Sequence, residues 1–247
     1  TISGNTAGSD GGGMNLYESD PTITNVTISG NTANDDGGGM YLVGNSNPTI
    51  TNVTISGNTA NETGGGMRIS NSNPIITNVT ISGNTANETG GGMNLSGSDP
   101  IITNVTISGN TANETGGGMN MLYSSPTLTN SILWGNTPQE ISFRVEYDPS
   151  SITITYSDIQ GGQDSIVTND NGTVTWGDGN IDIEPMFVDT ANGDYHLLAD
   201  SRLIDAGHPD STDADGTIAD IGAYYYDQAG QPVRVSNLIT TPSADNV

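Results

Sequence analysis

Residues 37–63 read GGGMYLVGNSNPTITNVTISGNTANET, and the chain repeats this stretch with small changes along its first half. The mark GGGM begins at Gly11, Gly37, Gly64, Gly90 and Gly116, so successive units are 26 or 27 residues long. A period of this length is typical of solenoids, in which each unit packs on its neighbours. The repeat therefore excludes most folds that are built around one closed core.

The apolar residues within one unit predict short strands separated by bends. Met40 and Leu42 alternate with outward residues, as in a strand with one buried face. Ile50 is the next inward residue, and Val53 follows it at a spacing of three. Because a strand alternates with period two, this spacing requires a bend, and we expect a corner at Asn52.

A second corner is expected at Gly57, followed by the small inward residue Ala60. β-Branched Thr, Ile and Val dominate each unit, and no stretch has the 3.6-residue period of a helix. We therefore predict an all-β, right-handed parallel β-helix. Each coil of about 26 residues would hold three short strands, and successive coils would stack roughly 4.8 Å apart.

Equivalent positions in successive units form columns of like residues. The inward columns are Met14, Met40, Met67, Met93 and Met119; Ile23, Ile50, Ile76, Ile102 and Leu128; and Ile28, Ile55, Ile81, Ile107 and Leu133. Two asparagine columns comprise Asn25, Asn52, Asn78, Asn104 and Asn130, and Asn31, Asn58, Asn84, Asn110 and Asn136. Asparagine tolerates a left-handed backbone, and its amide can bond to the equivalent amide of the next coil. A structural role is expected for both columns.

The composition is strongly acidic, with 28 Asp and Glu residues against four Arg and no Lys, for a formal net charge of −24. This charge argues against nucleic acid and anionic membrane surfaces as partners. No apolar run is long enough for a membrane span, and the absence of cysteine leaves the redox compartment open. The chain begins in the middle of a unit, so we expect it to be a piece of a longer protein.

The repeat predicts three regions. Residues 1–137 form the regular coils, and residues 138–227 form irregular coils that close the C-terminal end of the solenoid. Residues 228–247 form a strand, VRVSNLI at 233–239, or a linker tail.

Several motifs after the regular units carry a resemblance to a known group of proteins. They are NSILWGN (130–136), YSDIQGG (156–162), GNIDIEPMFVD (179–189), GDYHLLADSRLIDAG (193–207) and DADGTIADIGAYYYD (213–227). Together they resemble the terminal portion of secreted bacterial right-handed parallel β-helix repeat proteins of the choice-of-anchor type. The internal units are similar to the repeats of polymorphic outer-membrane proteins, with Ile in place of Phe. The resemblance implies an extracellular or cell-surface location.

The densest acidic cluster lies near the C-terminus and comprises Asp205, Asp210, Asp213, Asp215 and Asp220. Several carboxylates on a glycine-tightened turn suit calcium, but the EF-hand pattern fails here. Two interpretations of this cluster stay open: it is a calcium site, or its aspartates cap turns. No cofactor is required. A second acidic column, Asp35, Glu62, Glu88 and Glu114, follows the return turns and predicts mutual repulsion or weak binding of cations.

Catalytic patterns are weak. Near-identical units argue against an active site, because such a site breaks repeat symmetry. Arg68 is the only basic residue of the regular coils, and His196 and His208 have no nucleophile context, so both histidines are expected to be structural.

We therefore predict a non-catalytic extracellular solenoid that serves as a stalk, an adhesin segment or a filament subunit. Its expected partners are glycans, a host or cell surface, or further copies of the chain in head-to-tail association. The alternative is a carbohydrate-binding or polysaccharide-degrading β-helix of the lyase or hydrolase type.

Overall fold

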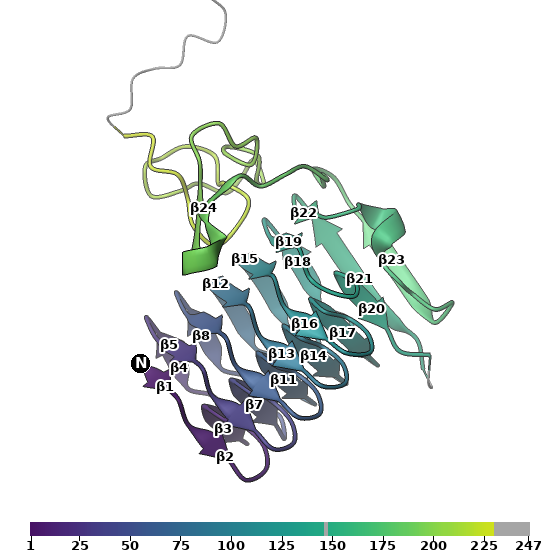
Figure 1. Cartoon of the computed structure of the whole chain (residues 1–247). Coiled ribbons are helices and arrows are strands. Elements are labelled where there is room, and N and C mark those ends of the chain that lie inside the picture. The colour runs from purple at the N-terminus through teal and green to yellow at the C-terminus, as the bar shows by residue number, and fades with distance from the viewer. Residues whose placement is uncertain (146–147, 230–247) are drawn as a thin grey trace, which may run out of the picture.

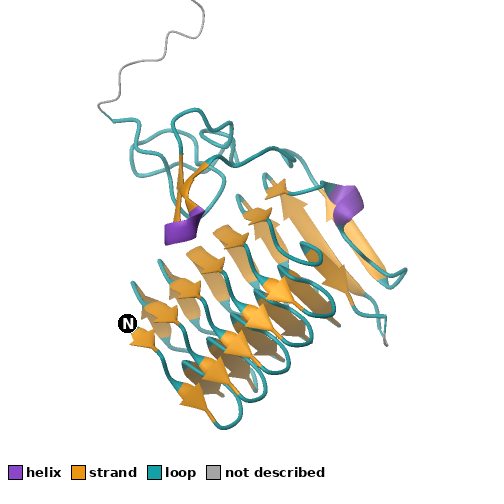
Figure 2. Cartoon of the chain, in the orientation of Figure 1, coloured by secondary structure: helices purple, strands orange, loops and turns teal. Residues whose placement is uncertain are grey.

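The structure is a computed structural model that describes residues 1–145 and 148–229 of the 247-residue chain. It is an all-β, right-handed parallel β-helix, as the repeat predicts. Figure 1 shows the coils stacked from the N-terminus to β23, followed by a segment that returns along one side of the stack. The described residues hold no α-helix and two short 3-10 helices, η1 (Gln163–Ser165) and η2 (Thr190–Asn192), drawn purple in Figure 2.

Successive coils pair in register in three parallel sheets. The first sheet holds the methionine strands β3 (Met14–Tyr17), β7 (Met40–Val43), β11 (Met67–Ser70), β14 (Met93–Ser96), β17 (Met119–Leu122) and β20 (Ile141–Phe143). The second sheet holds β1 (Ile2–Ser3), β4 (Thr22–Thr24), β5 (Thr27–Ser29), β8 (Thr49–Thr51), β9 (Thr54–Ser56), β12 (Ile75–Ser82), β15 (Ile101–Ser108), β18 (Thr127–Thr129), β19 (Ile132–Trp134), β21 (Ser150–Thr155), β22 (Asp158–Ile159) and β23 (Gly172–Trp176). The third sheet holds β2 (Thr6–Ala7), β6 (Thr32–Ala33), β10 (Thr59–Ala60), β13 (Thr85–Ala86) and β16 (Thr111–Ala112).

The corner predicted at the first asparagine column is a bend within the second sheet. Asn52 and Asn78 have φ values of 54° and 53°, in the left-handed region that asparagine tolerates. In β12 and β15 the strand runs through this bend, whereas in other coils the two halves are separate strands of the same sheet. The third side of each coil therefore comes from the Thr–Ala strands.

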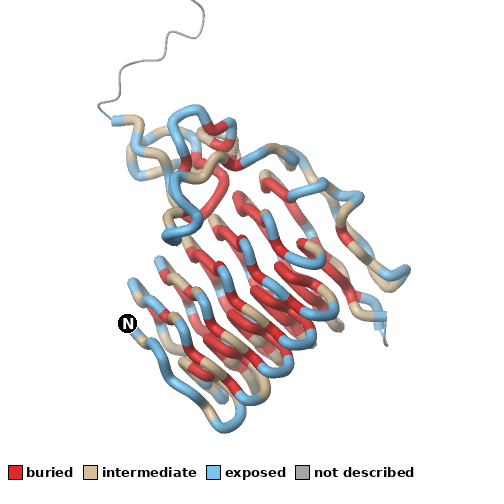
Figure 3. Tube along the Cα trace, viewed as in Figure 1, coloured by how far each residue is buried: buried red, intermediate tan, exposed pale blue. Residues whose placement is uncertain are grey.

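A single apolar seam runs along the inside of the stack. Met40, Ile50 and Ile55 have no exposed surface, and the residues that follow them in their columns are also buried. Figure 3 shows red, buried stretches that recur along the stack after the first coil. The predicted inward columns are confirmed, and each coil buries its core only against its neighbours.

The second asparagine column forms a continuous ladder of buried amides. Asn58 Nδ2 donates to Asn84 Oδ1 at 2.9 Å, and the backbone N–H of Asn58 donates to the same oxygen at 2.9 Å. The other amide hydrogen of Asn58 bonds to the Ile28 carbonyl at 3.0 Å. The amide-to-amide contact recurs from Asn5 to Asn136. Each interior amide is therefore buried with its donors and acceptor in use, as burial requires.

The three glycines of each GGGM mark meet two different needs. Gly64, the first, has φ of 70°, which favours glycine. Gly65 and Gly66 lack room instead, because an added Cβ would lie 2.5 Å from the Thr85 carbonyl oxygen and 2.6 Å from the Gly92 carbonyl oxygen, respectively. The mark is therefore a requirement of close coil packing.

A buried serine ladder was not predicted. The backbone N–H of Ser46 donates to Ser72 Oγ at 3.0 Å, and the N–H of Ser72 donates to Ser98 Oγ at 3.2 Å. The ladder runs through Ser19, Ser46, Ser72, Ser98, Ser124 and Ser150. Its signal in the sequence is a serine two residues before the proline of each regular unit.

The C-terminal region corrects the predicted closure of the solenoid. Residues up to β23 continue the stack, but the later chain runs back over the outside of the second sheet and forms the antiparallel pair β24 (Phe187–Asp189) and β25 (Asp194–Leu197) (Figure 1). We call residues 184–229 the returning segment. It covers a side of the solenoid, whereas the sequence analysis expected residues 138–227 to close its C-terminal end. The strand expected at 233–239 lies outside the described residues.

The returning segment is held by a small second core. Ile132 and Trp134 take outward positions of β19, where the preceding coil has Thr106 and Ser108. Ile132 is buried with Leu203 and Ile221 of the returning segment, and Trp134 packs against this cluster. The replacement of outward polar residues by large apolar ones was the sequence signal for this docking.

Candidate functional site

The acidic cluster near the C-terminus organises the loops of the returning segment. Asp220 accepts hydrogen bonds from the backbone N–H groups of Asp205 at 2.7 Å and Tyr226 at 2.6 Å. Asp213 accepts from the N–H of Asp220 at 2.8 Å. Burial raises the pKa of Asp220 to about 6, although these hydrogen bonds lower it. Asp213 and Asp220 therefore cap loops, which was one of the two readings of the sequence.

The remaining members of the cluster lie in similar contacts or in solvent. Asp215 accepts from the Thr217 hydroxyl at 2.7 Å and the Gln228 N–H at 3.0 Å, and these groups hold the pKa of Asp215 below its usual value. Asp205 accepts from the Gln228 amide at 3.0 Å, and Asp210 is exposed. Across residues 1–145 and 148–229, no three Asp, Glu or His side chains are arranged to hold a metal ion. Calcium binding stays a prediction.

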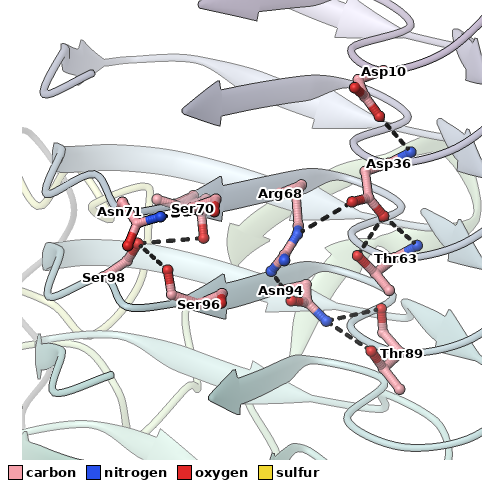
Figure 4. A network of polar contacts seen from close by, with 11 residues as sticks. Asp10, Asp36, Thr63, Arg68, Ser70, Asn71, Thr89, Asn94, Ser96 and Ser98 are labelled. Atoms are coloured by element: carbon pink, nitrogen blue, oxygen red, sulfur yellow. Dashed lines mark hydrogen bonds and ion pairs between the residues drawn. The ribbon is translucent and has the colours of Figure 1, made fainter. Parts of the chain in front are cut away.

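Arg68 lies on the outward face of β11 and links neighbouring coils (Figure 4). Its Nε lies 3.5 Å from Asp36 Oδ2, and its Nη1 donates to Asn94 Oδ1. The Asn94 amide in turn donates to Thr89 Oγ1 at 2.7 Å, and Asp36 accepts from the Thr63 hydroxyl at 2.6 Å. The Arg68 side chain is 17% exposed, and its contacts with Asp36 and Asn94 link neighbouring coils.

The acidic column on the return turns is exposed at Glu62, Glu88 and Glu114, and its charges interact. The pKa of Glu62 is raised chiefly by the nearby Asp36 carboxylate, and Glu88 and Asp35 add to this effect. The predicted repulsion between stacked carboxylates is therefore present at Glu62, at the surface of the solenoid.

Two buried carboxyl groups lie at the last coils. Glu140 ends the asparagine ladder, where it accepts from the backbone N–H of Asn136 at 3.0 Å and from the Asn136 amide at 2.5 Å. Burial raises the pKa of Glu140 to about 7 against the lowering effect of these bonds. Asp158, which has no exposed surface, accepts from the Ile183 N–H at 3.0 Å, and burial raises its pKa to about 7. Sequence analysis missed both residues because they lie where the repeat degrades.

We expect the free energy of unfolding to fall as the pH rises from 5 to 8. Both carboxyls titrate near their ordinary values of about 4 when the chain is unfolded, and near 7 when it is folded. A raised pKa in the folded state stabilises the fold fully below the unfolded pKa, and this stabilisation is lost as the pH rises through the folded pKa. Urea unfolding at four pH values measures the slope.

The variant Glu140→Gln tests the assignment of this pH dependence. We expect the slope between pH 5 and 7 to become shallower by up to about 1.4 kcal/mol per pH unit, the contribution of one proton. Asp164→Asn, in the exposed 3-10 helix η1, is the matched control and is expected to leave the slope unchanged. A free energy of unfolding that rises with pH over this range contradicts the prediction.

A cleft of about 290 Å³ lies where the returning segment meets the bend of the second sheet. Its solenoid wall comes from Asn25, Asn52, Val53, Thr54 and Asn78, and its other wall from His196, Ala223, Tyr224 and Tyr225. We call it the asparagine–tyrosine cleft. The two walls are far apart in the sequence, so no spacing could predict the cleft.

The histidines have different surroundings. His196 lies in the wall of the cleft, stacked on Tyr224 with ring centroids 4.3 Å apart, and its Nδ1 is 2.7 Å from Asp194 Oδ1. This hydrogen bond lowers the pKa of Asp194. The backbone N–H of His208 donates to Asn130, and its ring packs on Tyr156, so His208 docks the returning segment. The structural role expected from the sequence therefore fits His208. The side chain of His196 is 57% exposed and lines the cleft.

A family of known proteins agrees with the fold of the first coils. The profile of a family described as "right handed beta helix region" matches residues 1–87. The crystal structure of pectate lyase Pel9A is similar with a TM-score of 0.48 and 13% sequence identity, over 89% of this chain and 69% of that one. No curated protein matches the sequence. The chain is thus a parallel β-helix repeat protein.

Among the described residues, no helix has the length and apolar character needed to cross a membrane.

Proposed function

We propose that the chain is a non-catalytic, extracellular surface solenoid that serves as a stalk, an adhesin segment or a filament subunit. The observation that carries this proposal is the in-register stacking of near-identical coils, which repeats the same outward residues along the rod. Such a surface suits length, rigidity and multivalent contact with glycans or a cell surface better than it suits one unique pocket. The acidic charge of −24 favours solubility outside the cell.

Head-to-tail association of copies follows from the same geometry. The regular coils pair in parallel with their neighbours through three sheets, and this geometry favours pairing between an end coil of one copy and an end coil of another. Electron microscopy of the purified chain over a hundredfold range of concentration tests this. Filaments that lengthen with concentration support self-assembly, and short isolated rods at every concentration overturn it while leaving the stalk and adhesin roles.

The runner-up is a polysaccharide-degrading β-helix, and one assay separates it from the proposal. The chain is incubated with calcium and acidic polysaccharides, and unsaturated products are followed by ultraviolet absorbance, with reducing ends followed on neutral ones. We expect no turnover, because Arg68 is engaged by Asp36 and Asn94. Sustained product formation that Arg68→Gln abolishes overturns the non-catalytic proposal.

A further inference from the structure

We propose that the asparagine–tyrosine cleft binds a neutral sugar ring. The cleft combines free amides on one wall with aromatic rings on the other, and it arises where the returning segment crosses the solenoid. This inference goes beyond the function proposed for the rod and does not depend on it.

The solenoid wall offers unpaired amide groups. Asn104 Nδ2 donates to Asn78 Oδ1 at 3.2 Å, and Asn78 Nδ2 donates to Asn52 Oδ1 at 3.2 Å. Within the described residues, the Asn52 Nδ2 group and the Asn25 side chain have no such partner, and both residues are exposed. An amide that accepts at its oxygen is a stronger donor at its nitrogen, so Asn52 Nδ2 is poised to bond a ligand oxygen.

The opposite wall offers aromatic surface. Tyr224 is fixed by its stacking on His196, which is held by Asp194, so this wall is organised before a ligand arrives. Tyr225 lines the same cleft and is 41% exposed. A sugar ring presents C–H groups on its faces and hydroxyl groups around its edge. Aromatic rings pack against the C–H faces, and amides form hydrogen bonds with the hydroxyl groups.

The charges at the cleft favour a neutral sugar. No Lys or Arg lines the cleft, and the chain carries a net charge of −24. A sugar acid would enter a negative field without a cationic partner, at a cost in affinity. A sugar with only hydroxyl and acetamido groups avoids this cost.

A carbohydrate array tests the proposal with the full chain. The array carries neutral hexose and N-acetylhexosamine oligosaccharides, with oligogalacturonates as the acidic comparison, and each hit is measured by isothermal titration. We expect neutral hits. We expect Tyr225→Ala and Asn52→Asp each to weaken binding about tenfold, which corresponds to the loss of one good contact. Asp at position 52 retains an acceptor for Asn78 and tolerates the left-handed backbone, so the fold is preserved.

Matched controls separate a local effect from a general one. Tyr17→Ala removes a tyrosine that is 64% exposed on the first sheet, and Asn61→Asp adds the same charge on an exposed return turn. Both are expected to bind within twofold of the parent chain. The absence of neutral hits, a preference for oligogalacturonates, or full binding by both cleft variants overturns the proposal. An array without any hits also counts against glycan contacts of the rod, whereas the stalk and filament roles are tested separately by microscopy.

Discussion

Gly91→Ala is expected to destabilise the solenoid by more than about 3 kcal/mol. An added Cβ would lie 2.5 Å from the Thr111 carbonyl oxygen and 2.6 Å from the Gly117 carbonyl oxygen. Both are backbone atoms in neighbouring parts of the stack, so no side-chain rotation relieves the overlap. The coils must instead move apart, and the sheets that join them lose hydrogen bonds. Urea unfolding followed by circular dichroism measures the loss.

Gly83→Ala is the matched control, because it changes the same residue type in the preceding unit, where the glycine is needed for a different reason. Gly83 has φ of 60°, and a Cβ added there would meet no atom within 4 Å. The expected loss is only the backbone strain of about 1–2 kcal/mol. Equal losses in the two variants would mean that backbone conformation, and not coil packing, accounts for the second glycine of the GGGM mark.

Asn84→Ala is expected to cost about 4 kcal/mol, because it removes the middle rung of the amide ladder. Asn84 Oδ1 accepts two hydrogen bonds from Asn58, each at 2.9 Å, and Asn84 Nδ2 donates to Ile55 at 3.0 Å and to Asn110 at 2.9 Å. Asn58 has no exposed surface, so its two donors would be left buried without a partner. Each such group costs about 1–3 kcal/mol.

Asn87→Ala provides the comparison for this second variant. Asn87 is exposed on the following return turn, and its amide lies 3.5 Å from Asn61 Oδ1. Substitutions at such positions usually change stability by less than about 0.5 kcal/mol. Thermal unfolding of both variants gives the difference, and similar midpoints would show that the ladder adds little to stability.

The regular coils could be predicted because the sequence states the same rule repeatedly. A column such as Ile28, Ile55 and Ile81 fixes both the inward face and the register, since any slip would expose every member at once. The bend at Asn52 could be predicted for a similar reason, because the spacing of its apolar neighbours has one geometric solution. Periodicity thus carries information on contacts between units, but only where the units are alike.

The cleft and the buried acids could not be predicted, because they depend on contacts that occur once. Tyr225 meets the solenoid near Asn52 only after the chain has turned back over the second sheet. Glu140 reaches Asn136 within a segment that no longer follows the repeat. The sequence left two readings of Asp213 and Asp220 open, because a group of carboxylates on a turn does not by itself distinguish cation ligands from residues that cap loops.

The ladder of buried asparagine amides gives the rod a net dipole along its axis. Every rung donates from its own coil to the next one toward the C-terminus, so the amide dipoles add along the axis. The row ends at the carboxyl group of Glu140, which receives the last donor. A rod lengthened or shortened by one whole coil keeps this terminus unchanged, whereas a rod that ends one residue before Glu140 exposes two unpaired donors. The number of repeated coils thus sets the length of the ladder, whereas Glu140 sets how its C-terminal end is satisfied.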